Sequence, residues 1–302
     1  MTSIIVLNQT NLINAENNTL VYKFPNSVQF PHHQIAVQSV SMYYSWQNIN
    51  SSPLANNTLN ITVVVGSTQS TQTITIPNGL YEITDLNNYF QYWCIQNGFY
   101  LIDSTTSDNL YFFEIIVNPT SYAIQINTFP VPTSLPTGYT APDNWIGFPS
   151  TTYNPSLTFL SKFNQIVGFS AGFSTPLYTT SSFSSGSFNS AGTYSALSTQ
   201  TPNVQPNSNL LFSVSNINNK YAIPSSIIYS LSPSVAIGNQ IIEKPPQFSW
   251  NKLLAGTYHE LRLQLLGTDY SPLTILDSNM TILLAIRDMK DVDLMSLVEG
   301  GK

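Results

Sequence analysis

The feature of this chain that most constrains its fold is a period of two in its apolar residues. Apolar side chains recur at every second position in the segments 59–65, 74–76, 261–265 and 280–286. Because successive side chains of an extended strand point to opposite faces, this alternation predicts β-strands with one buried face. Six side chains are expected to point into one core between two facing antiparallel sheets: Leu261, Leu263, Leu265, Ile282, Leu284 and Ile286. Further strands are expected at 34–46, 110–117, 121–129, 209–217 and 225–231.

One segment has helical spacing instead. Leu86, Phe90 and Trp93 recur with a period typical of an amphipathic helix. Thr84 is expected to cap this helix and Gly98 to end it, with the apolar face packed onto or beside the sandwich. Many strands with a single helix favour a sandwich or a jelly roll over an α/β fold. The predicted fold class is therefore all-β, an antiparallel jelly-roll sandwich with one short helix and long loop excursions rich in Ser, Thr and aromatic residues.

Two stretches interrupt the strand pattern. Residues 130–156 are rich in proline, and residues 170–208 are rich in Ser, Thr, Gly and aromatic residues. We predict a single jelly-roll domain over 1–302, with room for a loop-derived insertion within 130–208. Aromatic side chains are poor residues to leave in water. Five of them are therefore expected to pack on the body of the protein or on a neighbouring subunit: Phe173, Tyr178, Phe183, Phe188 and Tyr194.

The composition points to a surface of neutral polar groups. Only 8% of the residues are charged, against about 25% in an average soluble domain. Amides and hydroxyls cost less to desolvate than charges, which suits extensive protein contact. The few basic residues are not clustered, so direct binding of nucleic acid is not expected. No run of about 20 apolar residues predicts a membrane span, no signal peptide is visible, and the single cysteine fits a reducing compartment.

Candidate residues for chemistry are sparse. His32 and His33 come at the expected start of a strand without other metal ligands nearby in sequence, so a structural role is expected. Cys94 lies on the apolar helix, where a buried, inert thiol is the common case. His259 shares the alternation of Leu261 and is expected at a strand end, in the core or in an interface. A spatial pair of carboxylates of the glycosidase kind stays open. The chain is expected not to be an enzyme and to need no cofactor and no metal.

Four segments carry a family resemblance: ITIPNGLYEITDLNNYFQ, NLYFFEIIVNPTSYAIQINTFPVPTSLPTGY, FNQIVGFSAG, and NKYAIPSSIIYSLSP followed by EKPPQFSWNKLLAGTYHELRLQLLGTDYSPLTILDSNMTILLAIRD. In this order they resemble the penton, or minor capsid, proteins of virophages and of Maverick/Polinton-type elements. The resemblance covers most of residues 74–288. The N-terminal part resembles the family only in its richness in strands, and residues 170–208 match nothing in it.

The resemblance implies a single jelly roll with an added element, standing at the five-fold vertex of an icosahedral virus particle. Five copies would close a ring and contact the surrounding major capsid protein, a trimer of double jelly rolls. The protein would then be part of the virion and be assembled inside the infected host cell, in the cytoplasm. A closed ring needs a head-to-tail interface between two different surfaces of the same chain.

The alternative function is a host-attachment or carbohydrate-binding jelly-roll module, and pentamer formation discriminates between the two. Assembly is expected to depend on the segment 243–250. Pro245 and Pro246 remove two backbone donors, so this segment cannot be a central strand and belongs on a loop or a sheet rim. Phe248 and Trp250 then either fold back as a lid on the core or anchor a neighbouring subunit. Together with the five aromatic residues of 170–208 they form the predicted subunit interface.

Overall fold

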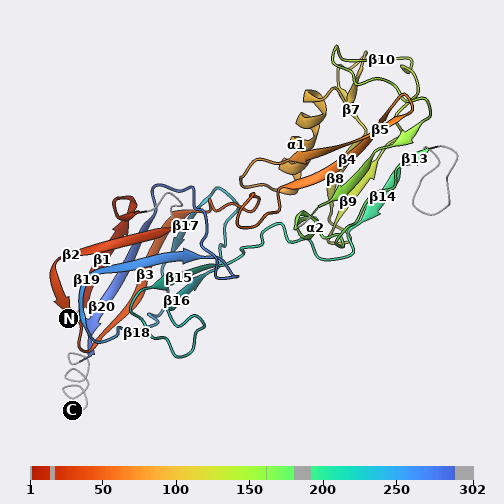
Figure 1. The fold of residues 1–302 in the computed structure, drawn as a ribbon. Helices are drawn as coiled ribbons and strands as arrows, with labels where there is room; N and C mark the ends of the chain where they lie inside the picture. The colour runs from red at the N-terminus through yellow and green to blue at the C-terminus, as the bar shows by residue number, and fades with distance from the viewer. Residues whose placement is uncertain (1, 14–17, 161, 180–191, 290–302) are drawn as a thin grey trace. The chain divides into compact units, whose positions relative to one another are not determined.

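The chain forms two compact units. The computed structural model describes residues 2–13, 18–160, 162–179 and 192–289. Unit 1 consists of residues 1–47 and 207–302, and unit 2 consists of residues 48–206 (Figure 1). Unit 2 thus begins well before the stretch 130–208 in which an insertion was expected. That residues 1–302 fold as one cooperative domain stays a prediction.

Unit 1 is a sandwich of two antiparallel sheets (Figure 1). The first sheet has the strand order β1 (Thr2–Asn8), β20 (Thr281–Asp288), β3 (His33–Tyr43) and β17 (Gln240–Glu243), and β18 (Asn251–Lys252) pairs with the start of β3. The second sheet has the order β16 (Ile227–Leu231), β15 (Leu210–Val214), β19 (Thr257–Leu266) and β2 (Thr19–Gln29). A short 3-10 helix, η1 (Gln9–Asn11), follows β1.

This strand order is that of a jelly roll. Along the chain β1, β2 and β3 alternate between the two sheets, the hairpin β15–β16 stays in the second sheet, and β17, β19 and β20 alternate again. Each sheet therefore interleaves strands from both ends of the chain, as in the double Greek key of an eight-stranded jelly roll. The predicted fold class is confirmed. Unit 2 interrupts the jelly roll between β3 and β15.

The predicted core of unit 1 is also confirmed. All six alternating side chains of β19 and β20 are buried, and they share one cluster with residues of the facing strands, such as Leu7, Val40 and Phe212. Burying a side chain of this size contributes about 1.5–3 kcal/mol each. The two sheets therefore pack against each other through the side chains that the period of two predicts to be buried.

His259 departs from the alternation. The pairing of β19 with β2 shifts between Tyr258 and Glu260, and His259 is exposed. A bulge adds one residue to a strand and so changes which face the preceding side chains take. The expectation that His259 lies in the core is therefore wrong.

Unit 2 is built from several small sheets. Their orders are β12 (Ser156–Phe159), β4 (Thr58–Val65) and β5 (Thr68–Thr75); β14 (Tyr194–Leu197), β9 (Ala123–Thr128) and β8 (Phe113–Asn118); β10 (Tyr139–Thr140), β6 (Tyr100–Asp103) and β7 (Asn109–Tyr111); and β11 (Tyr153–Asn154) with β13 (Tyr178–Thr179). A four-residue helix, α2 (Phe163–Ile166), follows β12.

The predicted helix is α1 (Ile83–Gln96), which packs against β8 in unit 2. Its buried residues include Leu86 and Phe90, while Trp93 is partly buried against the same core. The expectation that its apolar face packs on the jelly-roll sandwich is wrong, because that face belongs to the separate core of unit 2. The expected cap is wrong, because Thr84 lies inside the first turn. The backbone N–H of Glu82 instead donates to the Asp85 carboxylate at 2.9 Å, a pairing typical of a helix start.

Gly98 ends the helix as predicted. Its φ of +64° lies in the left-handed region, which a glycine adopts at little cost. A Cβ at this position would also lie 1.8 Å from the carbonyl oxygen of Asn144. No other residue fits there without moving the backbone.

The two units are joined by two peptide links, 47–48 and 206–207. On the jelly-roll side, Trp46 Nε1 donates to the carbonyl oxygen of Asn207 at 2.9 Å. On the other side, the Asn48 amide donates to the carbonyl oxygens of Val204 and Tyr81 at 2.8 and 2.7 Å. In each unit the outgoing and returning chain are therefore held next to each other.

Candidate assembly surface

The segment 244–250 joins β17 to β18 at the rim of the first sheet. Both of these short strands pair with β3, and no strand pairing of the described residues includes the segment itself. The prediction that its two prolines place it on a loop or rim is confirmed. Its side chains are therefore positioned by the two strands that flank it.

Trp250 packs against the Arg287 side chain and not against the core. The Arg287 guanidinium lies 4.1 Å from the centre of the Trp250 ring, and Arg287 donates to Gln34 Oε1 at 2.9 and 2.8 Å. A guanidinium over an indole face contributes about 0.5–1 kcal/mol at an exposed site. The Phe248 ring packs edge-on against Trp250 at 5.6 Å between centroids.

Neither Phe248 nor Trp250 belongs to the jelly-roll core or to the partly buried side chains that pack against it. Phe248 is 40% exposed. The core-lid alternative is therefore wrong, and the alternative in which these rings anchor a neighbouring subunit stays a prediction.

A tyrosine with a raised pKa contacts the end of β17 at this rim. The Tyr229 hydroxyl donates to Glu243 Oε1 at 3.2 Å, at the end of β17. Burial and the neighbouring Glu243 carboxylate raise the pKa of Tyr229 to about 12. The tyrosine therefore stays neutral and keeps donating at any physiological pH.

The aromatic residues predicted between 170 and 208 belong to unit 2, whereas Phe248 and Trp250 belong to unit 1. Phe173 packs on the core of unit 2. Its ring centroid lies 5.8 Å from that of Phe159 and 4.3 Å from that of Phe169. Tyr194 is half-buried on β14, and the backbone of Tyr178 pairs with Asn154. Two further predicted residues, Phe183 and Phe188, lie outside the described residues. That these residues form one interface with Phe248 and Trp250 stays a prediction.

The residues considered for catalysis or metal binding lie in surroundings that favour a structural role. Cys94 is buried in α1, and burial raises the pKa of its thiol, so the reactive thiolate is disfavoured. His32 is exposed, and His33 begins β3. Within the described part of the chain, no three His, Cys, Asp or Glu side chains converge as a metal site would require. None of the helices described there is long and apolar enough to cross a bilayer.

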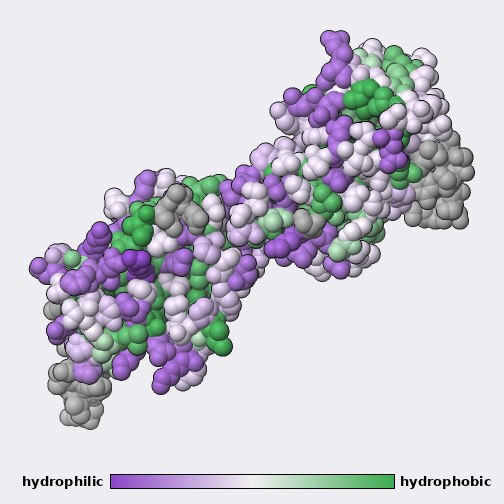
Figure 2. All heavy atoms as spheres, viewed as in Figure 1, coloured by the Kyte–Doolittle hydropathy of each residue, from purple (hydrophilic) through white to green (hydrophobic). Residues whose placement is uncertain are grey.

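Sequence reasoning missed the apolar side chains that the jelly roll leaves in water. On β1 the alternation places Ile5 and Leu7 in the core and leaves Ile4 and Val6 exposed, and Ile242 is exposed on β17. Figure 2 shows hydrophobic side chains at the surface among hydrophilic ones. The run Ile4–Leu7 is apolar at every position, so its pattern gives no sign of which face is buried.

Solved structures that are similar to this chain include two from virophages. One is the mavirus penton protein, with 9% identity and a TM-score of 0.41 over 96% of this chain and 99% of that one. The other is from the Sputnik virophage, with 9% identity and a TM-score of 0.40 over 97% and 98% of the two chains. No family model matches the sequence, and no curated protein matches it.

Proposed function

We propose that this chain is a structural minor capsid protein that forms pentamers at the five-fold vertices of an icosahedral virus particle. It contacts a major capsid protein built of double-jelly-roll trimers and is assembled inside the host cell. Jelly rolls occur in viral capsids, lectins and cupins, so the fold alone does not decide between these functions. The surface of unit 1 and the family resemblance of the sequence support the capsid function.

The observation that carries the proposal is the outer face of the first sheet. Ile4 and Val6 of β1 stand opposite Ala285 and Leu283 of β20, and residues directly opposite each other share a face. From there the face continues over Ser39 and Ser41 of β3 to the exposed Ile242 of β17: Leu283 stands opposite Ser39, and Ser41 stands opposite Ile242. We call these seven residues the outer apolar face.

The exposed large side chains of the outer apolar face, Ile4, Val6 and Ile242, are uncharged, whereas Ala285 is fully buried and Arg287 follows it on the same side of β20. Contiguous exposed apolar surface on a soluble protein marks a contact with another protein, and the centre of such contacts is depleted in charge. A lectin or an enzyme has no need of such a face on the outside of its sandwich, whereas a capsid subunit is surrounded by neighbours. The four segments that resemble virophage-type penton proteins support the same function.

The test is the mass and symmetry of the purified full chain across a range of protein concentrations. Light scattering is expected to show a species of five copies, and electron microscopy is expected to show five-fold rings. A matched variant, Val6→Asp, places a charge on the outer apolar face without touching the core and should weaken assembly into particles. A monomer or a two-fold dimer at every concentration would contradict the proposal.

A further inference from the structure

The jelly roll presents two large apolar side chains on one ordered loop. In the connection between β15 and β16, Tyr221 is 100% exposed and Ile223 is 85% exposed. The loop is closed by hydrogen bonds: Asn219 N–H donates to Ser225 O at 2.8 Å, the Asn219 amide donates to Ile227 O at 2.8 Å, and Tyr221 N–H donates to Asn219 Oδ1 at 3.1 Å. We call residues 221–223 the knob. A rigid loop loses little entropy when it binds.

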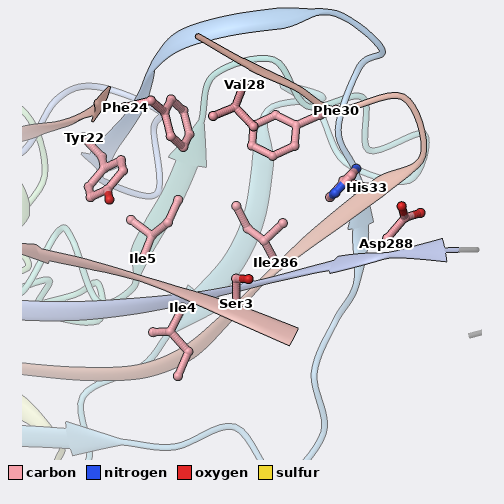
Figure 3. A pocket seen from close by; sticks show the side chains of 10 residues that line it. All are labelled: Ser3, Ile4, Ile5, Tyr22, Phe24, Val28, Phe30, His33, Ile286 and Asp288. Carbon is pink, nitrogen blue, oxygen red and sulfur yellow. The ribbon is translucent and has the colours of Figure 1, made fainter. Parts of the chain in front are cut away.

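The same unit contains a cavity of about 400 Å³ at the edge where β1 and β2 come together. Figure 3 shows Tyr22, Phe24, Val28 and Phe30 on one side of this cavity, and Ile5 and Ile286 on the other. We call it the β1–β2 cavity. Ser3 and Asp288 also line it, and the aromatic and aliphatic part of the lining suits a side chain with a large apolar surface.

One end of the β1–β2 cavity contains a polar group in need of a partner. His33 also lines the cavity, with its ring 5.0 Å from that of Phe30 (Figure 3). Its Nδ1 atom is buried and has no hydrogen-bond partner among the described residues. An unsatisfied buried nitrogen costs about 1–3 kcal/mol. Because this nitrogen is out of reach of a group in the cavity, a tyrosine side chain would be held there by its ring.

The strand orders place knob and cavity on opposite edges of the sandwich. β1 and β2 form one pair of sheet edges, and β17 and β16 form the other. The knob leads into β16, and the cavity lies at β1 and β2. An interface between two different surfaces of one chain is what a closed ring of five needs.

Knob and cavity also lie at the same end of the sandwich. Ile217, which begins the knob loop, bridges to Leu253. The neighbouring Lys252 pairs with Gln34, which follows His33 of the cavity. A copy placed beside the first can therefore meet the cavity with its knob without being shifted along the sandwich.

We propose that the knob of one copy inserts into the β1–β2 cavity of the next copy in the ring. The Tyr221 ring packs among the aromatic side chains of β2, and Ile223 covers the mouth. The inference rests on the ring proposed above and specifies its contact.

The first test is the double variant Tyr221→Ser, Ile223→Ser in the full chain. Both side chains are exposed, so the melting temperature should not change, whereas self-association measured by sedimentation should weaken by at least about tenfold. The matched control is Tyr122→Ser, because Tyr122 is 80% exposed but lies in unit 2, and it should associate like the wild type. A knob variant that associates like the wild type would overturn the inference.

The second test is a cross-link between copies. In a Cys94→Ser background, Tyr221→Cys is combined with Ser3→Cys, which lines the cavity, and oxidised glutathione is added. The expected product is a disulfide-linked series that ends at five copies and requires both cysteines. Rings that form without this cross-link would overturn the inference and leave the proposed function standing, whereas a wild-type chain that forms no ring at all would overturn both. A chain ending at Met289 tests residues 290–302 as the occupant instead. It should associate unchanged, and stronger association would count against a second copy.

Discussion

In unit 1, strands of up to eleven residues form two facing sheets around one core, whereas in unit 2 short strands form small sheets around a helix and an aromatic cluster. The charges differ as well. Unit 2 carries six carboxylates and a single lysine, a net charge of −5, so that −1 of the total of −6 remains for unit 1. Unit 1 is thus a nearly neutral and regular scaffold, and unit 2 is an acidic and irregular addition with a core of its own.

The largest effect is expected from Phe90→Ala in unit 2. Phe90 is buried, and its ring lies 6.1 Å from Phe113 and 6.4 Å from Phe163 between centroids. Removing it should lower the free energy of unfolding by about 3–5 kcal/mol, measured by denaturant titration. The control is Tyr92→Ala on the exposed side of the same helix, with an expected change within about 0.5 kcal/mol. Equal losses for the two variants would contradict a helix packed by its Phe90 face.

A slightly smaller effect is expected from Leu263→Ala in unit 1. Leu263 is fully buried in the jelly-roll core, so the loss of stability should be about 2–5 kcal/mol. Its neighbour Arg262 is exposed and paired with Glu260 at 2.7 Å, a surface ion pair worth about 0–1 kcal/mol. Arg262→Ala is therefore the control on the same strand. A loss below that of the control would refute the assignment of Leu263 to the core.

Calorimetry of Phe90→Ala and Leu263→Ala also tests whether the two units unfold together or separately. If residues 1–302 fold as one domain, each variant lowers the temperature of the same single transition. If the two cores unfold independently, each variant lowers a different transition.

High pH is expected to destabilise unit 2 more than unit 1. Burial raises the pKa of Tyr153 from 10 to about 12. Its contribution is therefore fully present below pH 10 and is lost as the pH rises to 12, because only the unfolded chain ionises easily in that window. The loss is about 2–3 kcal/mol, and Tyr153→Phe should remove it from the pH profile of stability. Tyr229→Phe in unit 1 should have a smaller effect, because Tyr229 is partly exposed and solvent screens its charge. A profile that Tyr153→Phe leaves unchanged would contradict this.

The smallest effect on stability is expected from Trp250→Ala. The side chain is only partly buried and packs on Arg287 and Phe248 outside the core. Its removal should cost about 1–2 kcal/mol in thermal unfolding, less than a core aromatic, and should weaken assembly if it anchors a neighbour. Trp250→Phe keeps a ring at this position and should retain most of both. A loss of stability as large as that of Phe90→Ala would contradict this and favour the alternative in which Trp250 covers the core.

Sequence alone predicted the regular part of this molecule. The alternation at Leu261–Leu265 and at Ile282–Ile286 is long enough to identify the buried face, and it is correct at all six positions. It fails at His259, because a bulge depends on the partner strand and leaves no mark in the sequence. The pattern also fails at Thr84, because the helix starts two residues earlier, with Glu82 as its N-cap paired to Asp85.

The boundary of unit 2 and the knob could not be predicted for a different reason. Asn48 begins unit 2 through hydrogen bonds to Tyr81 and Val204, partners that are distant in sequence, with no glycine or proline run to mark the place. Tyr221 and Ile223 have the composition of core residues, and only the folded loop shows that they point into solvent. Of the predicted interface, the rim with Phe248 and Trp250 could be located because two adjacent prolines exclude a central strand.

The hydrogen bond between Trp46 and Asn207 has a consequence for how such genes can change. It holds the two cut ends of the jelly roll together, so a linker of a few residues would close the gap left by removing residues 48–206. The entropy of closing a loop grows only with the logarithm of its length, so this position tolerates a graft of almost any size. Recombination at the two links would exchange the whole of unit 2 and leave all seven strand pairings of unit 1 intact. Such an exchange would replace unit 2 and leave the fold and surface of unit 1 unchanged.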